Sequence, residues 1–466
     1  MRTGLWELAE WDAVETRDRI RRGDVSAAEV VDAACARAEA VAPLNAIVTK
    51  TFERAREAAP KATGPLAGVP TFVKDLAQMR GVRTAWGSAS SGEYVSRRSD
   101  PIVRALEAAG LVSLGKSATP EFGLTATTEP LRFGPCKNPW ALDRTPGGSS
   151  GGAAALVAAG VVPIAHASDG GGSIRIPAAC CGLVGLKPSR HRLDMEGSNL
   201  LPVNIAVDGV VTRTVRDTIA FFDAIERGRR RRLAPIGPIA GPTQRRLRLG
   251  VFVESPRHTP VDAAVRATIT RTAKLCEGLG HDVHLLPCPF DGQVVDDFIR
   301  LWGLVAWIQV TGGALLTHGG YEKAQVEPFS RGFARAFAAE PRAAFAAIPR
   351  LRAFPKEYAA VMAGFDALIG PTLAEVPPLL GHLATDQPFG ETLARLLTFG
   401  PLTGLVNVAG APAVSLPMGR TAEGVPIGVQ FAAAHGNERT LLELALELEA
   451  AAPWPRLAPR SAFASA

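Results

Sequence analysis

Two serines and a lysine are the side chains of this chain that could carry out acyl transfer. Ser149 lies in the glycine-rich run 146–152, Ser173 follows three consecutive glycines further along, and Lys74 lies well upstream. A serine hydroxyl attacks a carbonyl once a base takes its proton, and a lysine is such a base when burial lowers its pKa. The N–H groups of a glycine run can form a nest for the developing oxyanion. The sequence therefore predicts acyl transfer without histidine.

The residue types alone leave the order of proton transfers open. The glycines 170–172 allow a substrate carbonyl to approach Ser173 closely, so we interpret Ser173 as the nucleophile and Ser149 as the relay to Lys74. A direct contact between the lysine and the nucleophilic serine is a simpler alternative. Ser149 is itself an alternative nucleophile.

The flanks of these residues indicate how they are held. Asp169 and Arg175 flank the glycine run, and we interpret them as pins that keep it from being a flexible loop. Lys74 follows the apolar pair Phe72 and Val73, so its stem is expected to enter the core at the end of a strand. Taken alone, Lys74 would fit better in a surface turn with Asp75, and it is the serine block that favours a catalytic role.

Three other patterns compete with this interpretation. The run 110–117 fits the phosphate-loop pattern, but a helix is expected before it and Pro120 follows it, whereas a phosphate loop follows a strand and opens a helix. The run 147–151 matches the nucleophile elbow of α/β-hydrolases, yet no apolar strand precedes it, and His382 and His435 have no recognisable motif. An anion, such as a substrate carboxylate, could also bind where the glycine run enters a helix over 153–159.

The elements that position these groups alternate between helices and strands. Helices are expected over 5–60, with Ser26 and Glu29 as a capping box, and short strands mix with helices over 60–220. Strands are expected at 247–253, 282–286, 367–372, 413–417 and 428–431, and helices at 262–279, 293–366 and 437–450. This alternation predicts an α/β protein with one large mixed sheet.

Composition narrows the class of protein further. A chain of 466 residues with 47% apolar residues has ample material for one large domain or two. The net charge of +6 is small and scattered, so no nucleic-acid partner is expected. The exception is the basic run 227–232, which we interpret as a solvated linker, with nucleic acid or anionic lipid as the alternative. No apolar run reaches the ~18 residues of a membrane span, so a cytoplasmic location without membrane contact is expected.

Cysteine and histidine spacing predicts neither disulfides nor a metal. The six cysteines match no disulfide or zinc pattern. His281 and His284 come nearest to a ligand pair but lie on an expected strand. No metal and no cofactor are predicted.

The ordered set of motifs resembles the amidase signature family. The resemblance spans nearly the whole chain and is weakest over about 225–395. The matching stretches are 68–75, 114–123, 127–129, 138–140, 146–152, 168–177, 181–188, 407–417 and 424–430.

The resemblance implies the amidase signature fold, an α/β core with helices on both faces of one large mixed sheet. It implies a single domain over 5–455 and a loose tail over 456–466. Within the domain, the signature core is expected at about 60–220 and 400–435, and a variable helical region at about 293–395 is expected to shape the substrate pocket.

The resemblance also assigns roles to particular residues. It implies a Ser–cisSer–Lys triad, with Ser173 as acylated nucleophile, Ser149 after a cis peptide bond, and Lys74 as base. Thr128 is a supporting residue. The residues implied for the oxyanion loop are Gly170, Gly171 and Gly172. Many relatives have threonine at the position of Gly170, so this loop is expected to keep its donors but be looser.

The function implied is an amidase that hydrolyses a linear or cyclic small-molecule amide without a cofactor. Within the family, the chain is similar to bacterial amidases of the 6-aminohexanoate cyclic dimer at 127–130 and 428–430. One alternative is the A subunit of a glutamyl/aspartyl-tRNA amidotransferase, although 399–403 lacks the acidic residue expected there before Asn407. The other is a catalytically silent binding protein on this scaffold. A homodimer is left open.

Overall fold

The core of the molecule is a mixed sheet. In the computed structural model, which describes residues 6–226, 232–317, 320–460 and 463, this sheet has eight strands in the order β4-β6-β5-β10-β11-β9-β7-β8. Strand β7 pairs in parallel with β8 and β9, and the other neighbours are antiparallel. The strands are β4 (Ile164–Asp169), β5 (Val184–Lys187), β6 (Val207–Thr212), β7 (Arg248–Val251), β8 (Asp282–Leu285), β9 (Ala367–Pro371), β10 (Ala413–Arg420) and β11 (Pro426–Ala432). The predicted large mixed sheet is confirmed.

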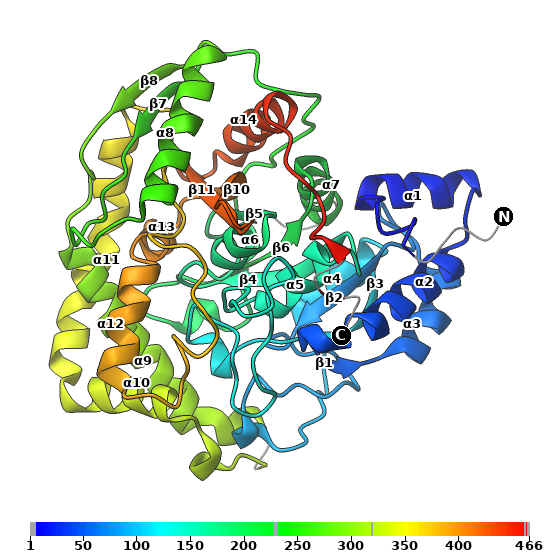
Figure 1. The fold of residues 1–466 in the computed structure, drawn as a ribbon. Helices are drawn as coiled ribbons and strands as arrows, with labels where there is room; N and C mark the ends of the chain where they lie inside the picture. Colours follow the sequence, from blue (N-terminus) through cyan, green and yellow to red (C-terminus); the bar gives the residue numbers. More distant parts are fainter. Residues whose placement is uncertain (1–5, 227–231, 318–319, 461–462, 464–466) are drawn as a thin grey trace.

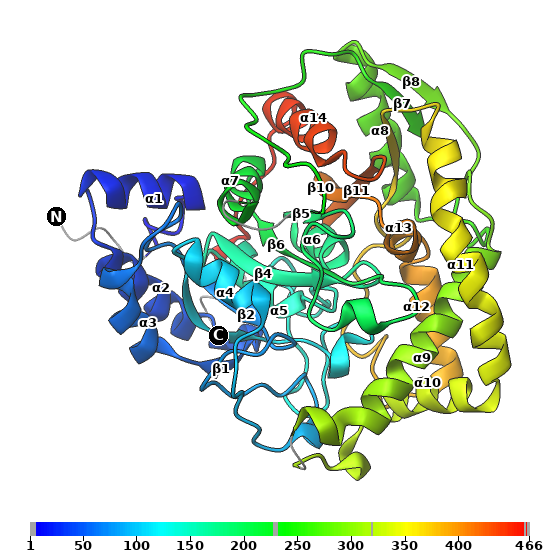
Figure 2. The same ribbon diagram turned by 180° about the vertical axis from the view of Figure 1, so that it is seen from behind.

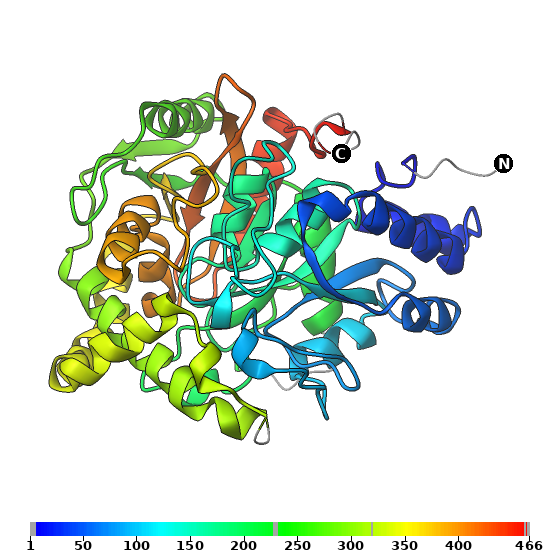
Figure 3. The same ribbon diagram turned by 60° about the horizontal axis from the view of Figure 1, so that its bottom comes forward.

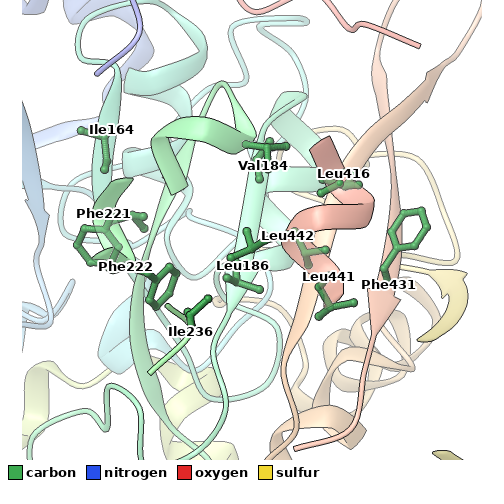
Figure 4. Packing of buried hydrophobic residues seen from close by; sticks show 14 of the residues in the cluster. Ile164, Val184, Leu186, Phe221, Phe222, Ile236, Leu416, Phe431, Leu441 and Leu442 are labelled. Atoms are coloured by element: carbon green, nitrogen blue, oxygen red, sulfur yellow. The ribbon is translucent and has the colours of Figure 1, made fainter. Parts of the chain in front are cut away.

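Helices cover both faces of this sheet because successive strand residues point to opposite sides. Ile164 of β4 packs in the core beneath α7 (Val215–Glu226), α8 (Ala263–Gly278) and α14 (Glu438–Ala451). The next residue, Ala165, packs in the other core with α5 (Gly151–Ala158) and α6 (Arg175–Cys181). Figure 4 shows the first of these cores, where side chains of the sheet meet Phe221, Phe222, Leu441 and Leu442.

A second, three-stranded sheet was not expected from the sequence. It has the order β1-β3-β2, formed by β1 (Ile47–Lys50), β2 (Pro70–Lys74) and β3 (Val112–Ser117). The expectation of helices throughout 5–60 is therefore wrong at 47–50. The helices α1 (Ala13–Arg22), α2 (Ala27–Ala40) and α3 (Phe52–Ala58) do form, in blue at one side of Figure 1. The capping box is confirmed, since Ser26 and Glu29 each accept a hydrogen bond from the other's backbone N–H.

The phosphate-loop look-alike forms strand β3, as its apolar pattern indicates. Helix α4 (Pro101–Ala108) precedes it, and the run does not open a helix. Its lysine, Lys116, is buried against Asp75 at 3.0 Å. The side chain that would have to reach a phosphate is therefore committed to an internal ion pair.

Long helices form a layer at one end of the molecule (Figures 1 and 2). These are α9 (Gln293–Leu316), α10 (Pro328–Ala339) and α11 (Pro341–Met362), in agreement with the expected helical region. Two further helices are α12 (Phe389–Phe399), which begins within the helical region expected at about 293–395, and α13 (Thr403–Ala409), where no helix was expected. Figure 3 shows these helices, in yellow-green and orange, at one edge of the molecule. Short 3₁₀ turns form at Ala42–Leu44, Ala59–Lys61, Ala89–Ser91, Glu121–Gly123, Ser198–Leu200 and Lys323–Gln325.

The expected loose tail is wrong for the part of it that the structure describes. The Ala458 N–H donates to the Ala158 carbonyl at 2.9 Å. Phe463 is buried, with its ring 6.4 Å from that of Trp6. The contact of Phe463 with Trp6 and the hydrogen bond of Ala458 therefore hold these residues against the core. Of the basic run 227–232, residues 227–231 lie outside the described part of the chain. Within that part, none of the helices combines the length and the apolar character needed to traverse a bilayer.

Candidate active site

Lys74 ends strand β2 and is fully buried, as expected for a side chain that enters the core. Its Nζ atom lies 2.8 Å from Ser149 Oγ, 3.0 Å from Ser168 Oγ and 3.4 Å from the Ser168 carbonyl. These three acceptors match the three N–H bonds of an ammonium group. The surface-turn alternative is excluded, and Ser168 is a partner of the lysine that the sequence did not single out.

Burial makes Lys74 a usable base. Loss of hydration lowers the pKa of Lys74 to about 7, although the charges of Asp169 and Asp208 act to raise it. A substantial fraction of the amine is therefore neutral near pH 7. The surrounding acceptors and carboxylates would then stabilise the ammonium that forms when it takes a proton.

A buried histidine holds the backbone of Lys74 but does not reach the serines. The Lys74 N–H donates to Nδ1 of His166 at 3.2 Å. The proton of this ring is thereby placed on Nε2, which faces Asp208 Oδ1 at 3.1 Å. His166 fixes the end of β2 against β4. Among the described residues, neither His382 nor His435 hydrogen-bonds to Ser149, so nothing favours the α/β-hydrolase arrangement.

The loop that carries Ser149 is held by Thr128. The peptide bond between Gly148 and Ser149 is cis, as the resemblance implied. Thr128 Oγ1 donates to the Gly147 carbonyl at 2.8 Å and accepts from the Gly151 N–H at 3.2 Å. A Cβ at Gly148 would lie 2.2 Å from a backbone oxygen, so this position requires glycine. Ser149 is thus presented to Lys74 by a loop with little freedom.

Asp169 and Arg175 form a fully buried, doubly hydrogen-bonded ion pair with both N···O distances at 3.0 Å. The Asp169 carboxylate also accepts from the N–H groups of Gly172 at 2.7 Å and Ile174 at 3.2 Å. Burial acts to raise the pKa of Asp169, but the Arg175 guanidinium holds that pKa well below its usual range. The carboxylate is therefore ionised, and it pins the loop as the sequence predicted.

Two residues from the end of the chain complete this network. Arg175 also donates to Asn407 Oδ1 at 2.6 Å and to Gln430 Oε1 at 2.7 Å. The Asn407 amide donates to the Asp169 carbonyl at 3.0 Å. Residue type and spacing did not single out Asn407 and Gln430 as members of the site. The signal that could have found them is that both lie in the C-terminal stretches shared with the amidase signature family.

The N–H groups of the glycine loop differ in whether they already donate a hydrogen bond. Among the described residues, the N–H groups of Gly170, Gly171 and Ser173 have no acceptor, whereas that of Gly172 donates to Asp169. In this structure the N–H of Gly172, one of the glycines expected in the oxyanion loop, is thus used to hold the loop. Gly172 also serves the turn, with φ 128°. Thr403 Oγ1 donates to the Gly171 carbonyl at 2.6 Å, which holds the loop from the other side.

Ser173 lies at the wall of a cavity of about 80 Å³, with 8% of the residue exposed. Within the described part of the chain, its Oγ forms no hydrogen bond, so the structure joins Lys74 to Ser149 but shows no direct bond from either to Ser173. The direct lysine–nucleophile contact is thus not observed for Ser173.

The cavity beside Ser173 is apolar, and none of the described residues that line it is charged. Phe298 and Trp302 of α9 stack with ring centroids 5.4 Å apart, and a Cβ at Gly171 would lie 2.9 Å from the Phe298 ring. The helices of the expected variable region thus supply much of this wall. The lining residues include Leu124, Ile176, Phe298, Trp302, Phe333 and Leu396.

Comparisons of the sequence with known proteins match it to amidases. A family model described as Amidase matches residues 29–442. The chain is 44% identical over 457 residues to AmiC of Mycobacterium tuberculosis, a protein provisionally named an amidase, covering 97% of this chain and 96% of that one. It is 35% identical to the 6-aminohexanoate-cyclic-dimer hydrolase of Paenarthrobacter ureafaciens, covering 98% and 97%.

Solved structures are similar over the same length. A 6-aminohexanoate cyclic dimer hydrolase complexed with substrate superposes with a TM-score of 0.88 at 32% identity, covering 97% of this chain and 99% of that one. A bacterial aryl acylamidase of the amidase signature enzymes superposes with a TM-score of 0.84 at 27% identity, covering 98% of each chain.

Proposed function

This chain belongs to the amidase signature family and is an amide-hydrolysing enzyme, and we propose that it works through an acyl-enzyme on Ser173 with Ser149 and Lys74 as the proton relay. The observation that carries this proposal is the 2.8 Å contact between Lys74 Nζ and Ser149 Oγ in a fully buried setting. Such a contact lets a neutral amine take the proton of one hydroxyl while that hydroxyl takes the proton of the next.

In the acylation step, Ser173 Oγ forms a bond to the amide carbonyl carbon. Its proton passes to Ser149, and the Ser149 proton passes to Lys74. The carbonyl oxygen becomes an oxyanion, for which the free N–H groups of Gly170, Gly171 and Ser173 are the candidate donors. The C–N bond then breaks as the relay returns a proton to the nitrogen, so that the amine leaves and Ser173 carries an ester.

In the deacylation step, a water oxygen attacks the ester carbon and its proton follows the same relay to Lys74. The bond to Ser173 Oγ then breaks and the serine recovers its proton. The acid is released, and Lys74 ends in the neutral state in which it began. No cofactor takes part in either half of the proposed reaction.

The lining of the cavity beside Ser173 supports a substrate whose acyl group is apolar and uncharged. A charged acyl group would lose its hydration there without a partner, since the lining residues carry no charge. The same feature disfavours an amidotransferase A subunit, because the ammonium and carboxylate groups of glutamine would need charged or polar partners. Linear and cyclic amides both remain within the proposal, and the named activity of the cyclic-dimer hydrolase supports the cyclic class.

A serine-reactive probe tests the proposal directly. The intact protein is treated with a fluorophosphonate and weighed by mass spectrometry, beside the Ser173→Ala and Lys74→Ala variants. One adduct on the unmodified protein that disappears in Ser173→Ala supports the mechanism and justifies a screen of amides. An adduct that persists in Ser173→Ala would contradict it and point to Ser149 or another site.

The cellular location and the oligomeric state of the enzyme are two separate proposals. We propose a cytoplasmic enzyme, with a homodimer as the assembly to be tested. Cell fractionation checks the first, and light scattering after size exclusion checks the second. A mass twice that of the 49.0 kDa chain would support the homodimer, and a mass equal to one chain would contradict it.

A further inference from the structure

A second cavity lies on the lysine side of the reacting centre. It has a volume of about 340 Å³, and its walls include Ser168 and His166, which hold Lys74. The neighbours Phe122 and Gly123 each line one cavity, Phe122 the second and Gly123 the one beside Ser173. Helix α9 contributes to both. The relay therefore lies between two cavities, and the proposed acylation uses only one of them.

Asp100, which lines the second cavity, has a carboxylate oxygen without a partner among the described residues. Asp100 occupies the N-cap position of α4, yet its side chain makes no cap hydrogen bond. One oxygen, Oδ2, accepts from the Gln78 N–H at 2.8 Å. The other, Oδ1, is buried and has no hydrogen-bond partner within the described part of the chain, although only 7% of the residue is exposed. A buried acceptor in this state is destabilising unless something donates to it.

An amide oxygen on the facing helix is in the same state. Gln309 of α9 lines the cavity, and its Oε1 is also buried without a partner among the described residues. Its Nε2 lies 3.5 Å from the Phe122 carbonyl. Two residues that line one cavity thus each carry a buried acceptor without a partner among the described residues, and this favours a ligand with several hydrogen-bond donors.

The charge around the cavity favours a cationic donor. Among the described residues, its walls carry the carboxylates of Asp100, Glu196 and Asp208 against the single guanidinium of Arg98. The Arg98 side chain is largely exposed and lies 3.6 Å from Glu196. Burial raises the pKa of Asp100, with a further rise from Glu196 and an opposing effect of Arg98. A bound cation would favour the ionised form of this carboxyl group.

The rest of the wall suits a hydrocarbon stem. Apolar and aromatic side chains line the space between these polar atoms, and aromatic rings attract a nearby cation. These side chains are Leu76, Ala77, Trp86, Ile102, Phe122 and Tyr321.

We propose that this cavity is the subsite for the amine half of the substrate, and that it takes an alkylammonium group. The inference rests on the proposed function: the acyl half occupies the apolar cavity beside Ser173, and the leaving amine carries a second, cationic amino group toward Asp100 and Gln309. The substrate class is then an amide of a diamine or of a similar amino-bearing alkylamine. Hydrolysis breaks its C–N bond and releases that amine.

Matched substrates test the proposal. The two amides share one apolar acyl group, and the amine half is either hexylamine or its aminohexyl counterpart. We expect the unmodified enzyme to show a kcat/KM at least about tenfold higher for the aminohexyl amide, as a charged hydrogen bond in a buried site provides. Asp100→Asn keeps an acceptor for Gln78, and it should remove most of this preference while changing the hexyl amide by less than about twofold. Gln309→Leu should reduce the preference to a smaller degree.

The matched control is Glu107→Gln, which removes an exposed carboxylate from the same helix and should leave the preference unchanged. Equal kcat/KM for the two amides in the unmodified enzyme, or a preference that survives in Asp100→Asn, would overturn the proposal.

Calorimetry with free hexylammonium gives a readout that does not depend on turnover. Binding to the unmodified protein that weakens at least about tenfold in Asp100→Asn supports the subsite. Absence of hexylammonium binding would overturn the proposal. Binding of hexylammonium to an enzyme that shows no kinetic preference for the aminohexyl amide would also overturn it, because hexylammonium would then be a ligand unrelated to the substrate. A protein whose Ser173 fails to react with the fluorophosphonate probe would refute the acyl-enzyme itself, which separates that failure from a failure of the subsite.

Discussion

The amine of Lys74 lies 2.8 Å from the hydroxyl of Ser149, and both groups are buried beside a second serine, Ser168. The lysine therefore has acceptors on all sides in the charged state and a hydroxyl within reach in the neutral state. In the proposed mechanism, this relationship makes Lys74 the group from which the activity and its pH dependence follow.

Replacing Lys74 should remove the proposed base with little effect on substrate binding. We expect Lys74→Met to lower kcat by about two to four orders of magnitude, the usual contribution of a general base, with KM changed by less than about threefold. Hydrolysis of a chromogenic anilide measures both constants. Lys50→Met is the matched control, because its amine is exposed in a surface pair with Glu39 and its loss should leave kcat unchanged. A Lys74→Met enzyme with near-normal kcat would contradict the assignment.

The pH profile should report the neutral lysine. Because burial lowers the pKa of Lys74 to about 7, kcat/KM should rise as pH increases through 7 and level off above it. The sign follows from the role, since only the deprotonated amine accepts a proton. A profile that falls through this range would show that the protonated form is required.

The same shift predicts a change in stability with pH. The unfolded lysine keeps its ordinary pKa of 10.5, so between about 7 and 10.5 the unfolded state binds more protons than the folded state. The contribution of Lys74 to the free energy of unfolding should therefore increase with pH across this window. Denaturant unfolding at several pH values measures it, and the slope should decrease in Lys74→Met. An unchanged slope would contradict the shifted pKa.

The buried pair of Asp169 and Arg175 should control stability and activity together. Asp169→Asn leaves the Arg175 guanidinium buried without its counter-charge, and breaking such a pair typically destabilises a protein by about 3–5 kcal/mol. We expect a clear drop in Tm and a loss of activity. The double variant with Arg175→Met should recover part of the Tm, because no unpaired charge remains, but not the activity, because the loop has lost its pin. Recovery of both would show that the carboxylate does not position the loop.

Two neighbouring glycines should respond differently to the same substitution. At Gly172 the backbone has φ 128° and an added Cβ would lie 2.3 Å from Thr403 Oγ1, so Gly172→Ala must displace the loop. At Gly170 the nearest atoms are 3.3 Å away in the Trp302 ring. We expect kcat to fall at least about a hundredfold for Gly172→Ala, the size of losing an oxyanion donor, and less than about tenfold for Gly170→Ala. Similar losses of kcat in both variants would contradict the different roles of Gly170 and Gly172 in the loop.

The stacked rings of Phe298 and Trp302 should limit the length of the acyl group that the enzyme accepts. Trp302→Ala removes one of the stacked rings beside Ser173 and enlarges the cavity. The ratio of kcat/KM for a longer acyl chain to that for a shorter one should then rise by about tenfold, as a few additional methylenes find room. Competition between two anilides in one reaction measures this ratio. An unchanged ratio would place the acyl group elsewhere.

Residue types that lie close together in the sequence were enough to predict much of the local structure. Apolar residues before Lys74 predicted a buried strand end, the glycines before Ser173 predicted a turn with close approach, and the alternation of helices and strands predicted a large mixed sheet. These signals lie within a few residues of one another, and the backbone responds to them directly.

Tertiary structure decided which groups meet. Arg175 bonds to Asn407 and Gln430, which lie 232 and 255 residues away along the chain, and no local periodicity specifies such partners. The same holds for Ser168 beside Lys74 and for the unpartnered oxygen of Asp100. Asp100 occupies the N-cap position before Pro101, but its carboxylate bonds to the Gln78 N–H from another segment instead of capping the helix. The sequence thus determined the reactive groups and their turns, whereas long-range packing decided the proton partners, the free N–H groups and the two cavities, because these depend on contacts between segments that are distant in sequence.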